Sequence, residues 1–250
     1  MNQRRLVWFS CGAPSAVAAK LTVQEYPGPD TEVVYCDTGG EHPDNKRFLL
    51  DVQRWLGVAV KVLQSRYTDH FDVALKTGYI AGPSGARCTK ELKRDLRQDY
   101  QRWNDIHVWG FTAEEQDRRE SFEDRFSNLR SEFPLIDNGI TRGDALALID
   151  RQGIELPIMY QIGYKNNNCV GCWKGGMGYW NKIRVDFPFI FDYAAKICRK
   201  IGRSPIKDKH GKPVMLDELD PSAGRYEDET EIECGVTCEL IDLKMRNAEQ

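Results

Sequence analysis

The segment "RRLVWFSCGAPSAVAAKLTVQEY" (Arg4–Tyr26) joins a short apolar run to an alanine-rich stretch through a tight turn. Residues 4–10 are typical of a buried strand. Residues 13–26, with Val17 and Leu21 among the alanines, are typical of a helix that packs on a sheet. A strand followed directly by a helix is the repeating unit of an α/β fold.

The same alternation continues along the first two-thirds of the chain. Further buried strands are predicted at 31–37 (TEVVYCD), 58–63 (VAVKVL) and 105–112 (DIHVWGFT). Further helices are predicted at 43–57 (PDNKRFLLDVQRWLG) and 141–153 (TRGDALALIDRQG). Thr141 is the expected N-cap of the last helix, and Gly153 its stop. This order predicts an α/β fold with a Rossmann-like, doubly wound parallel sheet and helices on both faces.

Length and composition limit the classes of protein that fit. A chain of 250 residues suits one large domain, or one domain with an appendage. The 35 basic and 38 acidic residues give no global basic field that would indicate a nucleic-acid or membrane partner. No apolar run is long enough to span a bilayer, and the first residues lack the pattern of a signal peptide. We therefore expect a cytoplasmic protein, in which eight cysteines indicate metal binding or catalysis rather than disulfides.

Three regions are expected from these patterns. Residues 1–165 form an α/β domain with ligand-binding loops, and residues 166–201 form a Cys-x-x-Cys metal segment with a helix. Residues 202–250 form a cysteine-rich C-terminal extension, in which the Pro-, Gly- and charge-rich stretch up to about residue 233 is a mobile linker to the tail.

The strand-to-helix loops are the expected ligand sites, because ligands bind beyond the carboxyl ends of parallel strands. The loop "SCGAPSA" (10–16) has Gly12 and the hydroxyls of Ser10 and Ser15 at the start of a helix, where backbone N–H groups and the helix dipole favour an anion. It matches neither a Walker loop nor a dinucleotide fingerprint, and an ordinary tight turn is the alternative. Asp37 and Thr38 follow the second strand, as nucleotide contacts or as loop caps.

Cys169 and Cys172 lie two residues apart in "NNNCVGCWKGG" (166–176). This spacing lets two thiolates meet one metal centre from a single turn. A thioredoxin-like dithiol is the alternative, but such motifs open a helix early in a βαβ unit, and this one does not. The four histidines are scattered and make no zinc-finger quartet.

Six motifs in order resemble one known family. They are "FSCGAPSAV" (9–17), "CDTGGEHPDNKRF" (36–48), "GARCTKELKRDL" (85–96), "FPLIDNGITRGDALALIDRQGIELP" (133–157), "YQIGYKNNNCVGC" (160–172) and "ECGVTC" (233–238). In this order they resemble the phosphoadenylyl-sulfate (PAPS) and adenylyl-sulfate (APS) reductases of the PP-loop, adenine nucleotide alpha-hydrolase-like superfamily. The resemblance covers nearly the whole chain.

The resemblance implies an adenine nucleotide as substrate, bound by Ser10, Gly12, Ser15, Asp37 and Thr38. Lys90 and Lys93, in the motif that carries Cys88, are expected to bind its phosphate or sulfate.

The resemblance also implies a [4Fe–4S] cluster on Cys88, Cys169 and Cys172, with zinc as the second choice of metal. The fourth ligand stays open among Cys198, Cys234, Cys238 and an exogenous group.

Two enzymatic hypotheses and one non-enzymatic hypothesis follow. The first is a reductase in which Cys234 attacks the sulfur of a sulfonucleotide and Cys238 resolves the intermediate, with a thiol electron donor such as thioredoxin. The second uses ATP and a three-cysteine cluster with an open iron to thiolate a base of RNA or DNA. The third is a nucleotide-binding module without catalysis. A homo-oligomer is compatible with each of them.

Departures from the family pattern affect which of these hypotheses the sequence favours. Pro14 stands before Ser15, where the ATP-pyrophosphatase relatives have aspartate, and this makes ATP cleavage a weaker expectation than nucleotide binding. Cys88 is single where the cluster-bearing reductases have a cysteine pair, and Thr237 with Cys238 replaces the histidine expected after Glu-Cys-Gly.

Overall fold

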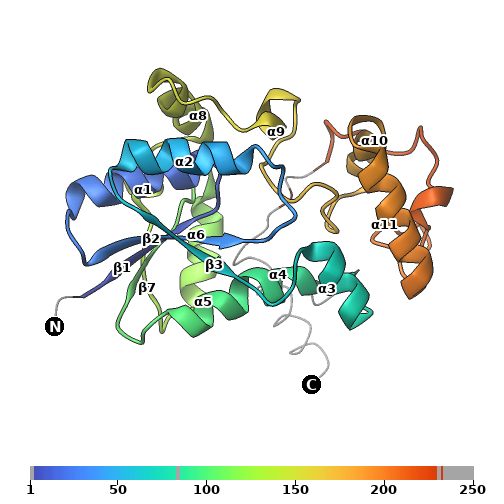
Figure 1. Ribbon diagram of the computed structural model, residues 1–250, viewed down its shortest axis with the longest axis horizontal. Coiled ribbons are helices and arrows are strands. Elements are labelled where there is room, and N and C mark those ends of the chain that lie inside the picture. The colour runs from blue at the N-terminus through green and yellow to red at the C-terminus, as the bar shows by residue number, and fades with distance from the viewer. Residues whose placement is uncertain (1–2, 83–84, 230–231, 233–250) are drawn as a thin grey trace. The chain divides into compact units, whose positions relative to one another are not determined.

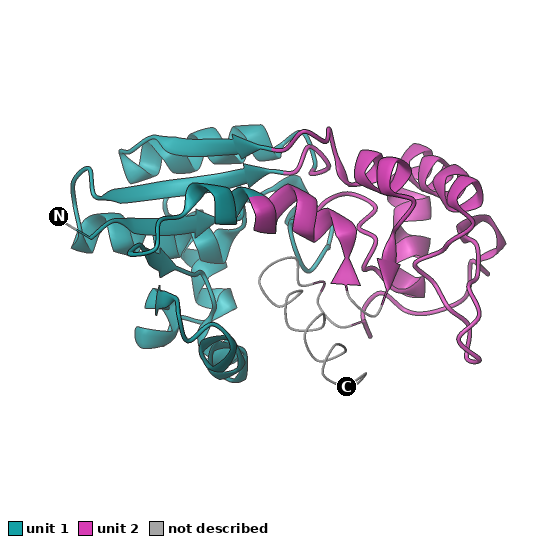
Figure 2. Cartoon of the chain, turned by 90° about the horizontal axis from the view of Figure 1, so that it is seen from below, with its two compact units in different colours: residues 1–37, 42–64, 96–167 teal, residues 38–41, 65–95, 168–250 magenta. Residues whose placement is uncertain are grey.

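The computed structural model describes residues 3–82, 85–229 and 232. Two compact units share the chain. Unit 1 comprises Met1–Asp37, His42–Gln64 and Leu96–Asn167, and unit 2 comprises Thr38–Glu41, Ser65–Asp95 and Asn168–Gln250 (Figure 2). Each unit therefore draws on separated segments of the sequence, whereas the sequence predicted contiguous domains.

A five-stranded sheet forms the centre of unit 1. The strands follow the order β3-β2-β1-β6-β7, and every neighbouring pair is parallel (Figure 1). Their bounds are Arg5–Phe9 (β1), Thr31–Asp37 (β2), Val60–Gln64 (β3), Ile106–Val108 (β6) and Arg130–Glu132 (β7). The predicted parallel sheet is confirmed, although the polar edge strand β7 gave no apolar signal.

Helices pack on both faces of this sheet. Val7 and Phe9 belong to an apolar core that also contains side chains of α1 (Ala13–Glu25), α2 (Asn45–Leu56) and α8 (Arg142–Arg151). Trp8 points to the opposite face because side chains alternate along a strand. There it stacks on His107 and Trp109, and Trp109 contacts Phe122 of α6 (Gln116–Arg125). The predicted doubly wound α/β fold is therefore confirmed.

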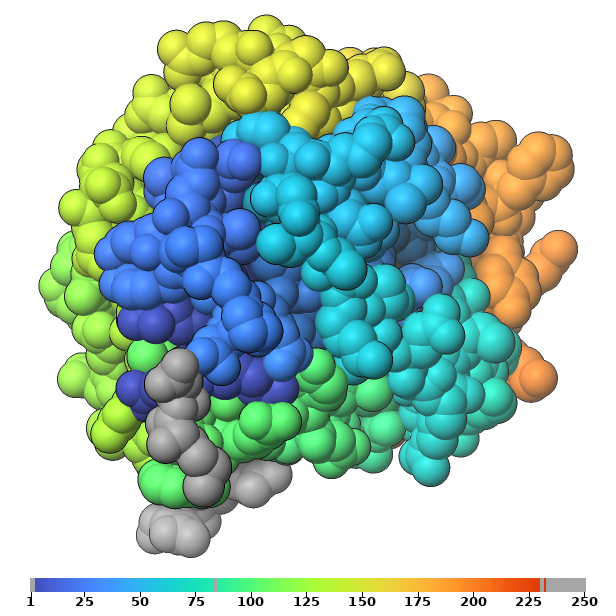
Figure 3. Space-filling view, turned by 60° about the vertical axis from the view of Figure 1, so that its left-hand side comes forward, coloured from blue at the N-terminus to red at the C-terminus, as the bar shows by residue number. Residues whose placement is uncertain are grey.

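Shorter elements complete unit 1. They are η2 (Ala113–Glu115), α7 (Pro134–Asp137), α9 (Ile158–Gln161) and most of α5 (Asp95–Tyr100). In the space-filling view, the blue and cyan surface of α1 and α2 continues into the yellow surface of the residues around α8 (Figure 3).

Unit 2 is helical, with one short hairpin. Its elements are α3 (His70–Thr77), β4 (Ala81–Gly82), β5 (Gly85–Ala86), α4 (Arg87–Thr89), the π-helix η1 (Lys90–Arg94), α10 (Met177–Asp186), α11 (Pro188–Ile201) and η3 (Leu216–Glu218). Trp173, Trp180 of α10 and Phe191 of α11 pack together as an aromatic core. Among the described residues, no helix has both the length and the hydropathy that crossing a membrane requires.

The stretch after α11 differs from the mobile linker that its composition predicted. Ile206, Leu216 and Leu219 are buried. The guanidinium of Arg184 donates hydrogen bonds to the carbonyl groups of Leu216 and Leu219. A few apolar residues at irregular spacing therefore anchor the described part of this stretch, and a composition average conceals them.

Candidate functional site

The turn between β1 and α1 contains a strained residue. Cys11 has a φ of 59°, the only positive value for a non-glycine residue within the described chain. Its carbonyl oxygen accepts a hydrogen bond of 2.7 Å from Nδ2 of the buried Asn167, which also lies 2.9 Å from Oδ1 of Asn45. Left-handed backbone at such a residue costs roughly 1–3 kcal/mol and persists only where the surroundings enforce it. The protein therefore holds this turn in one conformation.

Ser15 closes the turn from within. Its hydroxyl accepts from the N–H of Ser10 at 3.0 Å and donates to the carbonyl of Gly12 at 2.9 Å. The side chain is thus committed to the loop itself, and Ser10 Oγ lies 3.0 Å from it. Helix geometry leaves the first N–H groups of α1 without intrahelical acceptors, so backbone N–H groups at Gly12 and Ala13 are the natural anion contacts.

Two glycines allow close approach around this turn. A Cβ at Gly12 would lie 3.1 Å from the hydroxyl oxygen of Tyr160. A Cβ at Gly110, just after β6, would lie 2.7 Å from Cα of Ser15. In the sheet, β1 lies between β2 and β6, so the strand order reverses at β1. The turn after β1 is therefore at the topological switch point, where α/β folds bind ligands.

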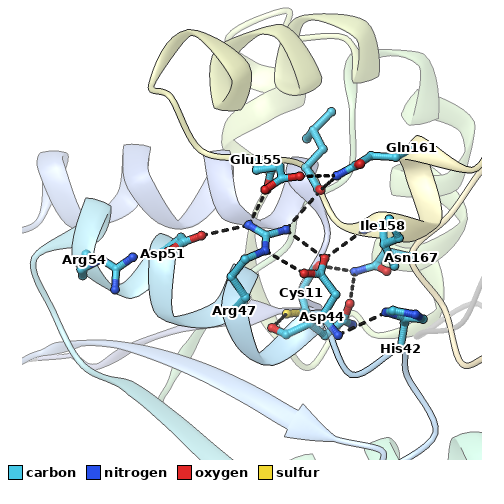
Figure 4. A network of polar contacts seen from close by, with 12 residues as sticks. Cys11, His42, Asp44, Arg47, Asp51, Arg54, Glu155, Ile158, Gln161 and Asn167 are labelled. Atoms are coloured by element: carbon cyan, nitrogen blue, oxygen red, sulfur yellow. Dashed lines mark hydrogen bonds and ion pairs between the residues drawn. The ribbon is translucent and has the colours of Figure 1, made fainter.

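A polar clamp at the start of α2 positions α9 (Figure 4). Arg47 makes a bidentate ion pair of 2.7 and 2.9 Å with Asp44 and donates to the carbonyl groups of Glu155 and Leu156. Asp44 also accepts from the N–H of Ile158 at 3.0 Å. The Arg47 guanidinium lowers the pKa of Asp44, which keeps the clamp charged. Because Tyr160 lies on α9, the clamp fixes the element that brings its hydroxyl to Gly12.

The other predicted nucleotide contacts are placed separately. Asp37 ends β2 and accepts from Gln64 Nε2 at 3.3 Å, in unit 1. Thr38 is buried in unit 2, with its hydroxyl 3.2 Å from the Sγ of Cys169. Lys90 pairs with Asp95, and Lys93 follows it within η1, also in unit 2. Ser10, Gly12 and Ser15 are the predicted contacts that the structure brings into one loop.

The three predicted metal ligands are buried cysteines of unit 2. Cys88 lies in α4, while Cys169 and Cys172 lie in the turn before α10. The hydroxyl of Tyr179 donates to the carbonyl of Cys169 at 3.2 Å and accepts from the N–H of Cys172 at 2.9 Å. These bonds hold the backbone of the Cys-x-x-Cys turn in one shape.

His70, the first residue of α3, is enclosed by the same turn. Its side chain is 1% exposed, and its Nε2 lies 3.1 Å from the carbonyl oxygen of Gly171. Its own carbonyl accepts from Trp173 Nε1 at 3.1 Å. Burial lowers the pKa of His70 to about 4, so the imidazole is neutral at pH 7. Sequence reasoning set this residue aside with the other histidines.

Three buried thiols have the donor chemistry that an iron–sulfur cluster or zinc requires. Across the described residues, which leave out Cys234 and Cys238, no three His, Cys, Asp or Glu side chains are already gathered as a metal site. Cys198 lies within α11, and burial raises the pKa of its thiol to about 12, which suits core packing rather than ligation. The catalytic assignments of Cys234 and Cys238 fall outside the described residues.

Comparison with known proteins bears on the fold. No protein-family model and no curated protein matches the sequence. PAPS reductase from Candida auris, solved in complex with phosphate, matches with a TM-score of 0.51 and 12% sequence identity, over 68% of this chain and 82% of that one. The chain has the fold of a PAPS reductase. The predicted resemblance is thereby confirmed at the level of the fold. The U34-tRNA thiolase NcsA from Methanococcus maripaludis, solved with its [4Fe–4S] cluster, also matches, with a TM-score of 0.44, 14% identity and coverage of 92% and 79%.

Proposed function

We propose that this protein is an enzyme that binds an adenine sulfonucleotide at the Ser10–Ser15 turn and reduces its sulfate group with cysteine thiols. The observation that carries the proposal is the turn itself: strained at Cys11, tied by Asn167, and placed at the switch point before α1. A pre-formed cradle of backbone N–H groups at a helix N-terminus suits the phosphate of a nucleotide.

In the proposed reaction the Cys234 thiolate attacks the sulfur of the sulfonucleotide. A sulfur–sulfur bond forms, the bond from sulfur to the phosphate oxygen breaks, and the nucleotide leaves with the electron pair. The Cys238 thiolate then attacks the Cys234 sulfur, which releases sulfite and leaves a disulfide. A dithiol donor of the thioredoxin class returns both cysteines to thiols, and it supplies the two electrons that the sulfate gains.

The described residues have defined tasks in this scheme. The N–H groups of Gly12 and Ala13 bind the phosphate, and the Ser15 hydroxyl holds the turn that presents them. Cys88, Cys169 and Cys172 would hold the [4Fe–4S] cluster, with zinc as the other metal. When bound, the cluster supplies an electron-carrying metal centre whose properties depend on its ligands.

The test is sulfonation of one cysteine. The Cys238→Ser variant, mixed with PAPS or APS, should accumulate a sulfonated Cys234 that mass spectrometry detects in the tail peptide, because the resolving thiol is gone. Cys234→Ser should form neither adduct nor sulfite. Cys198→Ser is the matched control, and it should react as the wild type does. An unmodified Cys234, with no sulfite from either nucleotide, would contradict the reductase.

A second candidate function is ATP-dependent thiolation of a nucleic-acid base. One observation favours it: Cys198 is buried within α11 and burial raises the pKa of its thiol, and a cluster held by Cys88, Cys169 and Cys172 alone would leave one iron open for sulfur. This enzyme would form no sulfite, and it would turn over ATP only with an acceptor such as RNA. The same assays therefore separate the two functions.

A further inference from the structure

The buried imidazole of His70 has one satisfied nitrogen and one unsatisfied nitrogen. Nε2 contacts the carbonyl of Gly171, between the two cysteines of the turn. Nδ1 has no hydrogen-bond partner in the described structure, although the residue is 1% exposed. An unpaired buried nitrogen is costly, so a native protein seldom keeps one without a use.

The hydrogen bond at Nε2 determines what Nδ1 can do. A carbonyl oxygen only accepts, so Nε2 carries the proton and Nδ1 presents its lone pair. Histidines that bind metals show this arrangement, in which the second ring N–H donates to a carbonyl or carboxylate and fixes the tautomer. His70 thus has the protonation pattern of a metal ligand.

The lone pair of Nδ1 lies near a predicted metal-ligating thiol. A Cβ built on Gly40 would be 2.2 Å from Nδ1 of His70 and 3.3 Å from Sγ of Cys169. The two atoms are therefore no farther apart than the sum of these distances. Gly40 also accepts from the N–H of Val170 at 2.9 Å, which fixes this glycine against the turn. Any larger residue at position 40 would fill the space between nitrogen and sulfur.

We propose that Nδ1 of His70 and the thiolate of Cys169 bind the same metal centre. His70 becomes the one non-cysteine ligand beside Cys88, Cys169 and Cys172, a position for which the sequence named only cysteines or an exogenous group. The inference rests on the metal centre of the proposed function. Because the described side chains are not yet gathered around one point, they must close around the metal when it binds.

A histidine in this position has a chemical consequence. With four protein ligands the cluster has no open iron for a sulfur donor, which favours the reductase over thiolation. Imidazole in place of thiolate also makes the ligand set less negative, as in the Rieske centres, where histidine raises the reduction potential.

The experiment compares full-length wild type, His70→Gln and His70→Cys after anaerobic reconstitution with iron and sulfide. His107→Gln is the matched control, because His107 is the other fully buried histidine and lies in unit 1. Pulsed EPR of the reduced protein should show nitrogen coupled to the cluster in the wild type and in His107→Gln. His70→Gln should lose that coupling and most of its iron, whereas His70→Cys should keep its iron and lose only the coupling.

Each outcome decides between ligand and core residue. Nitrogen coupling that persists in His70→Cys, or a wild type with iron but no coupled nitrogen, overturns the inference. If the wild type binds zinc instead of iron, the His70 inference is supported when Co²⁺ substitution gives nitrogen–sulfur ligand bands that His70→Gln abolishes. In that case the metal is zinc, and the assignment of an iron–sulfur cluster is wrong. A wild type that binds neither metal overturns it. Sulfite formation, measured separately, tells whether the proposed function fails as well.

Discussion

At the scale of single residues, the turn between β1 and α1 depends on Cys11 remaining in the left-handed region. A left-handed backbone is unfavourable for a cysteine by itself. It is stabilised here because the Cys11 carbonyl accepts a hydrogen bond from the side-chain amide of Asn167. The stabilising group is therefore more than 150 residues away in sequence. No local pattern around Cys11 could have indicated it.

Replacing Asn167 with alanine tests this dependence. The change removes the hydrogen bonds to Cys11 and Asn45 and leaves a buried carbonyl without a donor, so unfolding should become easier by about 1–3 kcal/mol. Adenine nucleotides should also raise the melting temperature less than in the wild type, because the turn loses its fixed shape. Urea unfolding and thermal shift with AMP measure the two effects. A variant that is destabilised but binds AMP with wild-type affinity would show that Asn167 serves only the core.

A side chain at Gly12 should block the same turn directly. Its Cβ would already be 3.1 Å from the Tyr160 hydroxyl, and the branches of valine would cover the backbone N–H groups that the phosphate needs. Gly12→Val should abolish the thermal shift given by adenine nucleotides. Gly143→Val is the control, since the Cβ of that residue meets only the Thr141 hydroxyl at 3.7 Å. Equal shifts in both variants would place the nucleotide elsewhere.

At the scale of elements, regular patterns were predictable and irregular ones were not. Thr141 accepts from the N–H of Asp144 and caps α8 as its sequence indicated. The strand at 31–37 was evident because its middle is a buried apolar run. The strand predicted at 58–63 lies at 60–64, on the edge of the sheet, where only Val60 is buried. In contrast, β7 is short and polar, and its position is set by pairing with β6 rather than by its own composition.

The clamp on α9 gives a prediction at this scale. Arg47→Lys keeps the charge but loses the planar fork that bridges Asp44 and two carbonyl groups, so we expect a loss of roughly 1–3 kcal/mol in unfolding free energy. Arg54→Lys is the control on the same helix. Arg54 is exposed and pairs with Asp51, and such surface pairs contribute at most about 1 kcal/mol. Urea denaturation of both variants measures the difference, and equal losses would contradict the clamp.

At the scale of the whole molecule, the sequence indicated candidate residues but not the contacts between distant segments. Residue types near motifs, such as Cys88 and the Cys169–Cys172 pair, could be named from their spacing and from the family resemblance. His70, Tyr160 and Gly110 could not be named, because each gains its meaning from a contact with a distant segment: the Cys-x-x-Cys turn, Gly12 and Ser15 respectively. Contacts of this kind arise only when the chain has folded.

The acid stability of the molecule should depend on histidines that the fold buries in neutral form. His107 accepts from Trp8 Nε1 at 2.9 Å, and its ring stacks on both Trp8 and Trp109. Burial is the main cause that lowers its pKa to about 4; the charges of Arg97 and Arg4 act in the same direction, and Asp105 opposes them. The unfolded chain has the ordinary histidine pKa of about 6.5. Between pH 4 and 6.5, His107 is therefore mostly protonated in the unfolded state and mostly neutral in the folded state.

The sign of the pH effect follows from this difference. The contribution of His107 to stability is nearly complete at pH 7.5 and falls as the pH drops towards 4, by roughly 2 kcal/mol between pH 7.5 and 5. His107→Gln keeps an acceptor for Trp8 but cannot be protonated. Urea unfolding at pH 7.5 and pH 5 should therefore show a smaller loss of stability on acidification in the variant than in the wild type. Because His70 is buried neutral in both proteins, its contribution cancels in the comparison. The same loss in both proteins would mean that His107 takes up its proton in the folded state, and that the stacked aromatic face opens before the rest of the molecule unfolds.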